Sequence, residues 1–147
     1  MRITIVAVGK IKEPGLRQLI DDYLKRIHRY SQVQEVEFKD DSVDKITERI
    51  QKAIPLRSRV IALEVSGKTY TSSQFATLLE HSEHDAIGTL VFVIGGAYGL
   101  PQEISRSAYL KLSLSPMTLP HRLARLFLVE QIYRGFSISR NEPYAHE

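Results

Sequence analysis

Short apolar runs alternate along the chain with segments in which apolar residues recur every three or four positions. Residues 3–8 form one β-branched apolar run, and residues 89–94 form the most hydrophobic one. Such runs are typical of strands buried on both faces of a parallel sheet. We expect 89–94 to be the central strand. Alternation over 35–39 predicts a half-exposed edge strand, and 60–65 and 110–114 predict two more strands.

Amphipathic segments separate these strands. Apolar residues recur at helical spacing over 16–27 and over 43–54, where Pro55 stops the second helix. Thr71, Ser72 and Ser73 offer caps for a third helix, Pro101 stands where a first helical residue belongs, and a final helix begins at about Pro120. Helices between successive strands imply right-handed crossovers, so the sequence predicts an α/β fold. Its five-stranded, mostly parallel sheet has helices on both faces.

The last helix departs from this pattern. Apolar side chains between Leu123 and Ile138 project in nearly every direction, which predicts burial on more than one side. One side can face the sheet, but a terminal helix has no obvious second partner within its own chain. We therefore predict a homodimer with two-fold symmetry, built on this C-terminal helix.

Length and composition narrow the possibilities. The chain has 147 residues, which predicts a single domain over 1–147. It contains no cysteine, so disulfides, thiol nucleophiles, iron–sulfur clusters and cysteine zinc sites are excluded. No apolar run approaches the ~20 residues that a bilayer demands, and the opening run is too short for a signal peptide. We expect a cytoplasmic protein with no membrane partner.

The formal net charge is +3, and it is unevenly distributed. Residues 1–30 carry seven bases and three acids, 31–100 carry seven and ten, and 101–147 carry six and four. The basic ends favour a phosphate-facing patch if the fold brings them together, whereas the alternative is a solvated helix face. The candidate bases are Lys10, Lys12, Arg17, Lys25, Arg26, Arg29, Arg134 and Arg140.

Two motifs are interpreted as structural. Residues 66–69 (Ser-Gly-Lys-Thr) resemble the tail of a phosphate-binding loop, but Ala62 stands where its first glycine is required. We interpret this segment as a tight turn, without ATP hydrolysis. His81 and His84 lie beside carboxylates but lack a third ligand elsewhere. We therefore interpret them as part of a solvated helix end, with no metal.

Two loops are the candidate ligand site. Gly95, Gly96 and Gly99 follow the predicted central strand, at the edge where open α/β sheets bind ligands. Their spacing is not that of a dinucleotide loop, and Leu119 stands where the ribose-binding acid would be expected. Residues 114–121 form a stiff loop with two prolines, which suits a flat heterocycle. A structural turn and a strand-to-helix connection are the alternatives.

Several ordered motifs together resemble the RlmH family. They are Val-Ile-Gly-Gly-x-x-Gly-Leu at 93–100, Leu-Ser-x-Met-Thr-Leu-Pro-His at 114–121, Glu-Gln-Ile-Tyr-Arg at 130–134 and Asn-x-Pro-Tyr at 141–144. The opening Ile-x-x-Val-Ala-Val-Gly-Lys and Ala-Leu-Glu-x-x-Gly-Lys at 62–68 also match. The resemblance implies a SPOUT-class enzyme that uses S-adenosylmethionine to methylate N3 of a pseudouridine in large-subunit (23S) ribosomal RNA, on the ribosome. It also implies a homodimer with a deep C-terminal trefoil knot.

The resemblance also assigns residues. It implies that the cofactor is bound by Leu63, Gly95, Leu114, Ser115, Pro116, Met117, Thr118 and Leu119. It points to Arg134 as a stabiliser of developing negative charge or a phosphate ligand, with an ion pair to Glu130 as the alternative. Tyr144 would stack on or hydrogen-bond the target base, and His146 would accept a proton.

Target RNA is expected to meet Lys10 and Lys12, in the loop after the first strand. The tail departs from the family pattern, because its histidine is displaced by one position to His146. Residues 139–147 either fray or cover a base. The competing interpretation is a non-catalytic RNA- or ribosome-binding assembly factor of the same fold, in which the glycine loop is only a turn.

Overall fold

The computed structural model describes residues 1–147, in which five parallel strands form a sheet of order β2-β1-β4-β3-β5. All six residues of β4 are buried at the centre, and β2 is an edge strand, as predicted. The strands are β1 (Arg2–Val8), β2 (Gln32–Phe38), β3 (Ser58–Thr69), β4 (Thr89–Ile94) and β5 (Leu110–Ser113).

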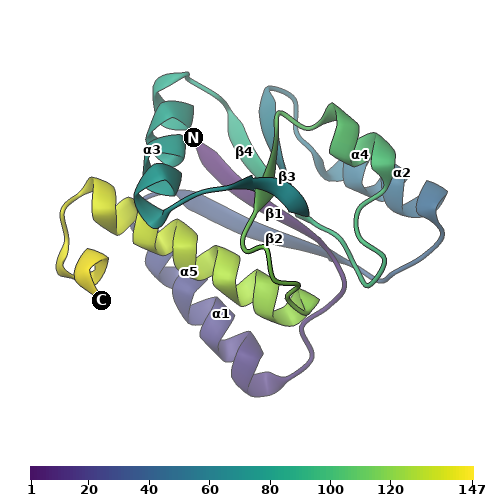
Figure 1. Ribbon diagram of the computed structural model, residues 1–147, viewed down its shortest axis with the longest axis horizontal. Coiled ribbons are helices and arrows are strands. Elements are labelled where there is room, and N and C mark those ends of the chain that lie inside the picture. The colour runs from purple at the N-terminus through teal and green to yellow at the C-terminus, as the bar shows by residue number, and fades with distance from the viewer.

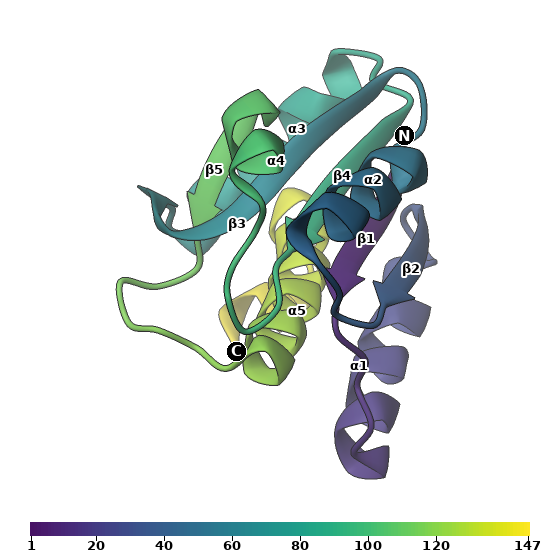
Figure 2. The same cartoon turned by 90° about the vertical axis from the view of Figure 1, so that its right-hand side faces the viewer.

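Helices cover both faces of the sheet, which confirms the predicted α/β architecture (Figures 1 and 2). The helices are α1 (Pro14–Ile27), α2 (Val43–Ala53), α3 (Ser72–His84), α4 (Gln102–Ser107) and α5 (His121–Ser139), followed by a short 3-10 helix, η1 (Pro143–His146). The larger core lies beneath α1, α3 and α5, and a smaller one lies beneath α2 and α4. None of these helices combines the length and apolarity that crossing a bilayer requires.

Helix α5 packs against the sheet between α1 and α3, which explains why its apolar residues face so many directions. The expectation that its own chain offers no second partner is therefore wrong. Helices α1 and α3, which are far from α5 in sequence, cover its two sides. Leu123 and Phe127 nevertheless keep 42% and 39% of their surface exposed, so one apolar strip of α5 remains uncovered.

Local capping signals agree with the structure in one case and differ slightly in another. The Thr71 hydroxyl accepts from the Gln74 amide, and the Gln74 side chain accepts from the Thr71 amide, so α3 begins with a capping box. Pro101 is the residue before α4 rather than its first residue, since its backbone is still extended.

The predicted tight turn at residues 66–69 is wrong, because β3 continues through it to Thr69. The pairing of β3 with β5 shifts register between Leu63 and Lys68. A side chain on Gly67 would place its Cβ 2.6 Å from the Lys111 carbonyl oxygen. Gly67 therefore allows β3 and β5 to approach each other closely, and it is not part of a phosphate-binding loop. The trefoil knot stays a prediction.

Candidate active site

A cavity of about 670 Å³ opens at the carboxyl edge of the sheet. Because all five strands are parallel, the loops that follow them open at this one edge. The loop after β4 and the loop after β5 form the cavity walls, together with the middle of β3. Of the predicted cofactor residues, Pro116 does not line the cavity. Those that do are Leu63, Gly95, Leu114, Ser115, Met117, Thr118 and Leu119.

The glycine loop folds tightly on itself. The Gly99 amide donates to the Gly96 carbonyl at 3.0 Å, and Gly99 has a φ of +79°. A Cβ added to Gly95 would lie 2.4 Å from the Gly99 carbonyl carbon. Two backbone segments thus touch where any side chain would separate them, and the turn presents main-chain groups to the cavity.

The loop after β5 is held by its own serines. The Ser113 hydroxyl donates to the Ser115 carbonyl at 3.0 Å, and the Met117 amide donates to the Ser115 hydroxyl at 3.0 Å. Such local bonds satisfy backbone groups that have no strand or helix partner. Met117 itself is mostly exposed. The loop therefore keeps a defined shape beside the glycine turn.

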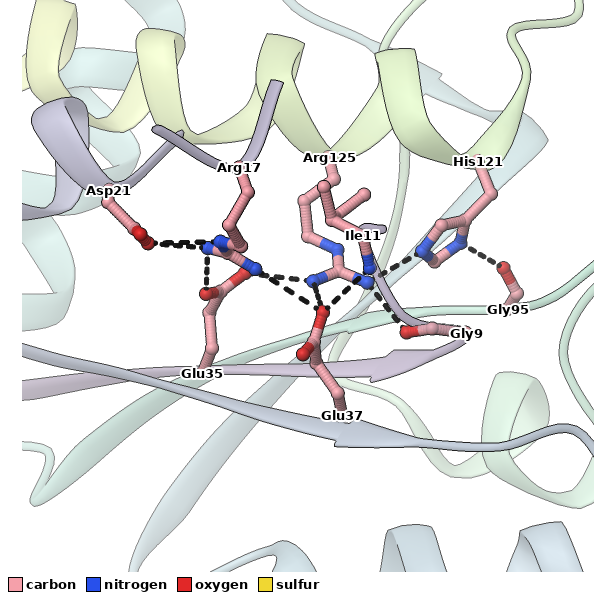
Figure 3. A network of polar contacts seen from close by, with 9 residues as sticks. All are labelled: Gly9, Ile11, Arg17, Asp21, Glu35, Glu37, Gly95, His121 and Arg125. Carbon is pink, nitrogen blue, oxygen red and sulfur yellow. Dashed lines mark hydrogen bonds and ion pairs between the residues drawn. The ribbon is translucent and has the colours of Figure 1, made fainter. Parts of the chain in front are cut away.

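The first turns of α5 connect these loops to a buried ionic network (Figure 3). Arg125 has 0% exposure, and its Nη1 donates to Glu35 at 2.8 Å and to Glu37 at 2.6 Å. Its Nη2 donates to the Gly9 carbonyl and to His121 Nε2, each at 2.8 Å. All four terminal guanidinium hydrogens are thereby used, while the buried Nε has no partner.

The two carboxylates come from the same face of edge strand β2. Glu35 and Glu37 are two residues apart, so their side chains point to the same side, toward α1 and α5. Arg17 of α1 also contacts both, and the Ile11 amide donates to Glu37 at 3.2 Å. Burial alone would raise the pKa of Glu37, but the hydrogen bonds from Arg125 and Ile11 hold that pKa below its ordinary value.

His121 connects Arg125 to the glycine loop through hydrogen bonds at both of its ring nitrogens. Because a guanidinium can only donate, His121 Nε2 must accept from Arg125, so the ring carries its proton on Nδ1. Nδ1 then donates to the Gly95 carbonyl at 3.0 Å (Figure 3). Burial, and then the charge of Arg125, lower the pKa of His121. A neutral imidazole therefore fixes the start of the glycine loop.

Sequence analysis assigned no role to His121 or Arg125. Arg125 lies at helical spacing with Leu128, Val129 and Ile132, all of them fully buried. An arginine in an otherwise apolar stripe of a core helix is the signal that identifies a buried ion pair. Alternation in β2 likewise predicted a half-exposed strand with Glu35 and Glu37 on its solvent side, whereas both carboxylates are largely buried and pair with Arg125.

A second cluster lies where α5 meets η1. Arg134 donates from Nη2 to Glu130 at 2.8 Å, and its Nη1 donates to the Glu147 carbonyl at 2.8 Å. Its guanidinium also lies 5.0 Å from the centre of the Tyr144 ring. Arg134 and His146 line a separate cavity of about 600 Å³ with Ser72, Ser73, Gln131, Ile138, Asn141, Ala145 and Glu147. The ion pair expected as the alternative for Arg134 is therefore present.

Tyr144 is tied to two neighbours. Its hydroxyl donates to Glu130 at 2.8 Å and lies 3.0 Å from the Tyr23 hydroxyl. Burial, followed by these two hydrogen bonds, raises the pKa of Tyr144 far above its ordinary value. Tyr144 is thus a neutral hydroxyl that donates a hydrogen bond to Glu130. The tail is ordered by these contacts rather than frayed.

The two clusters lie at opposite ends of α5 (Figure 1). His121 and Arg134 are 13 residues apart on this helix, or roughly 20 Å along its axis. The structure therefore brings the predicted cofactor residues together, and separately the predicted catalytic residues Arg134, Tyr144 and His146. Within one chain it does not bring the two groups together.

The predicted RNA-binding lysines are exposed. Lys10 and Lys12 lie in the loop between β1 and α1, at the same sheet edge as the cavity. Arg17, another candidate base, is instead committed to Glu35 and Asp21. His81 and His84 are exposed at the end of α3, and no group of three potential metal ligands is found.

A glycine loop and a proline-flanked loop at the carboxyl edge of a parallel sheet form a cavity where open α/β sheets bind ligands. The profile of a family described as "Predicted SPOUT methyltransferase" matches residues 1–146. The chain therefore belongs to the SPOUT methyltransferase family.

Curated relatives and a solved structure agree with this assignment. The chain is 45% identical to "Ribosomal RNA large subunit methyltransferase H" of Sorangium cellulosum, over 99% of this chain and 100% of that protein. It is 39% identical to the protein of the same name from Flavobacterium psychrophilum, with full coverage of both. A probable methylase family protein from Haemophilus influenzae shares the fold with a TM-score of 0.59, at 14% identity, covering 95% of this chain and 68% of that one.

Replacing Arg125 with Met should strongly destabilise the protein. The substitution leaves Glu35 and Glu37 partly buried without their main partner, so the free energy of unfolding should fall by about 3 kcal/mol. The control is Arg122→Met, because Arg122 forms a largely exposed ion pair with Glu13, and the decrease should be less than about 1 kcal/mol. Urea unfolding measures both. Equal decreases would refute the structural role of Arg125.

The stability contributed by His121 should depend on pH. Its folded pKa is depressed below the ordinary 6.5, so the unfolded state binds a proton that the folded state resists. The contribution is fully present above about pH 6.5 and is lost as pH falls toward the folded pKa.

Urea unfolding of the wild type and of His121→Gln, from about pH 7 to about pH 5, measures this. The stability difference in favour of the wild type should shrink at the lower pH. A difference that stays flat for His121 would show that the ring titrates normally.

Proposed function

We propose that this protein is a methyltransferase that uses S-adenosylmethionine to methylate N3 of a pseudouridine in 23S (large-subunit) ribosomal RNA, acting on cytoplasmic ribosomes. The observation that carries the proposal is the cavity between the glycine loop and the loop after β5, in a chain of the SPOUT family. Support for the substrate comes from the names of full-length relatives at 39–45% identity.

The cavity residues fit such a cofactor. A volume of about 670 Å³ lies within the range of small-ligand sites. Leu63, Leu114 and Leu119 give it apolar walls for a flat adenine, while the turn at Gly95 offers main-chain donors and acceptors for the polar edge. When bound, the cofactor supplies an already activated methyl group. The task left to the protein is to hold the acceptor nitrogen in line with it, which can lower the barrier by ~7–11 kcal/mol.

The second cluster, formed by Arg134, Tyr144 and His146 and called the tail cluster below, is proposed to receive the target base. Arg134 is the cation for the negative oxygen that develops when N3 loses its proton, or for a phosphate. The neutral Tyr144 hydroxyl offers a hydrogen bond, and the Tyr144 ring offers a stacking face. His146, exposed beside the cavity of Arg134, is the remaining proton acceptor.

A second copy of the chain is proposed to unite the two clusters. The tail of one chain lies roughly 20 Å along α5 from its own cofactor cavity. A groove of about 420 Å³ between them exposes Leu19, Leu123 and Phe127 and is mostly apolar. A two-fold dimer through this strip of α5 would cover the groove and carry each tail toward the other copy's cofactor. Lys10 and Lys12, at the same edge of the sheet as the cavity, would then meet the RNA.

Gly95→Ala should abolish cofactor binding. The new Cβ would collide with Gly99 and force the loop open, and calorimetry should show no heat with S-adenosylmethionine. The matched control is Gly15→Ala, because no atom lies within 4 Å of a Cβ built there. It should bind like the wild type. Tight binding by Gly95→Ala would disprove the cofactor assignment.

Mixing two inactive variants should restore methyl transfer. Arg134→Ala disrupts the tail cluster, and Gly95→Ala disrupts the cofactor cavity. In a mixed dimer, the intact tail cluster of the Gly95→Ala chain meets the intact cavity of the Arg134→Ala chain, which gives one complete site. After joint refolding, about half the dimers are mixed and each has one complete site, so about a quarter of wild-type activity should return.

Transfer of labelled methyl to ribosomes lacking the modification measures this, followed by mapping of the labelled base. An inactive mixture beside an active wild type would refute the shared site. A wild type that binds ribosomes but transfers no methyl would favour the non-catalytic assembly factor instead.

A further inference from the structure

A row of aromatic rings lines the junction of α1 with the C-terminal half of α5. Tyr30 stacks on Phe136 with ring centres 5.3 Å apart. Tyr133 lies 6.1 Å from both Tyr30 and Tyr23. Tyr133 also contacts Tyr144 edge-on at 4.6 Å. The row therefore runs from the end of α5 to the tail cluster without a break.

Three arginines lie over this row. The guanidinium carbon of Arg26 is 5.4 Å from the centre of Tyr23 and 5.6 Å from that of Tyr133. Arg29 lies 5.6 Å from the Tyr30 ring, and Arg140 lies 4.7 Å from it. A guanidinium that rests on a ring keeps N–H groups at its edge for other partners, and only one of these groups is used here, where Arg29 Nη2 donates to the neutral Tyr133 hydroxyl at 3.1 Å. We call Arg26, Arg29 and Arg140 the arginine row.

The arginine row differs from most other arginines in having no carboxylate partner. Arg17, Arg49, Arg59, Arg122, Arg125 and Arg134 each form an ion pair. All three row arginines are exposed and form none. Glu142, an acid close by, accepts instead from the Tyr30 hydroxyl at 2.5 Å. Three adjacent cations are thus held in place by rings and left uncompensated.

We propose that the arginine row binds consecutive phosphates of the ribosomal RNA strand that carries the target base. Uncompensated guanidinium groups over aromatic rings suit a sugar-phosphate backbone, which has a high density of negative charge. The row leads through Tyr133 to Tyr144 and Arg134, so a strand bound along it delivers its next nucleotide to the tail cluster. This inference rests on the proposed function and adds the three row arginines to the residues that would bind the RNA.

The test compares the salt dependence of ribosome binding among four proteins. They are the wild type, the triple variant Arg26→Ala/Arg29→Ala/Arg140→Ala, the same three positions changed to Lys, and the control Arg106→Ala. Arg106 is exposed on α4, beyond the opposite face of the sheet, and also lacks a carboxylate partner. Binding to ribosomes lacking the modification is measured over a series of potassium chloride concentrations.

The triple alanine variant should reduce the slope of log affinity against log salt by about two to three, somewhat less than one for each phosphate that the variant can no longer neutralise. Its KM for ribosomes should rise, while its binding of S-adenosylmethionine should match the wild type and show that it is folded. The triple lysine variant keeps the charges, so its slope should stay within about one of the wild type. Arg106→Ala should leave the slope unchanged.

Each alternative outcome is decisive. If the wild type methylates ribosomes and the alanine variant keeps the wild-type slope, the arginine row does not bind RNA although the proposed function stands. A wild type that neither binds nor methylates ribosomes overturns both. If the triple alanine variant fails to bind cofactor, the single variants replace it, and each should lower the slope by about one.

Discussion

The guanidinium of Arg125 is the interaction on which the arrangement of this protein depends. An ion at this depth is tolerated only when its partners are also held in place, because removing a charge from water is expensive. The structure meets this condition with two carboxylates of β2, the Gly9 carbonyl and the ring of His121. Segments that are distant in sequence are therefore joined at one point.

The same interaction links the core to the site. Through His121, the position of the Gly95 carbonyl depends on the side-chain geometry of Arg125. A loop rich in glycine has many accessible conformations, and binding a ligand with such a loop is costly unless one of them is already favoured. The histidine reduces this freedom at the first residue of the turn. The cavity wall, to which His121 itself belongs, is thereby pre-organised before a ligand binds.

Hydrophobic periodicity was sufficient to predict the strands and helices of the fold. It predicted the site only in part. The strands, the central position of 89–94 and the two cavity loops follow from local patterns that burial and turn chemistry impose. Gly67 was misjudged because a glycine used for strand passage looks the same as one used for a turn. Arg125 and Glu37 lie 88 positions apart, and no local pattern pairs residues at such a distance. The separation of Arg134 from the cavity is likewise a property of three-dimensional packing.

The place of α5 between α1 and α3 also affects how the protein is made. During synthesis the chain emerges from its N-terminus, so both flanking helices and all five strands leave the ribosome before the helix that fills the space between them. Until residues 121–139 follow, α1 and α3 can pack on the strands, but the sides of these helices that face α5 have no helix to contact. The core of the nascent chain therefore stays incomplete until α5 has left the ribosome.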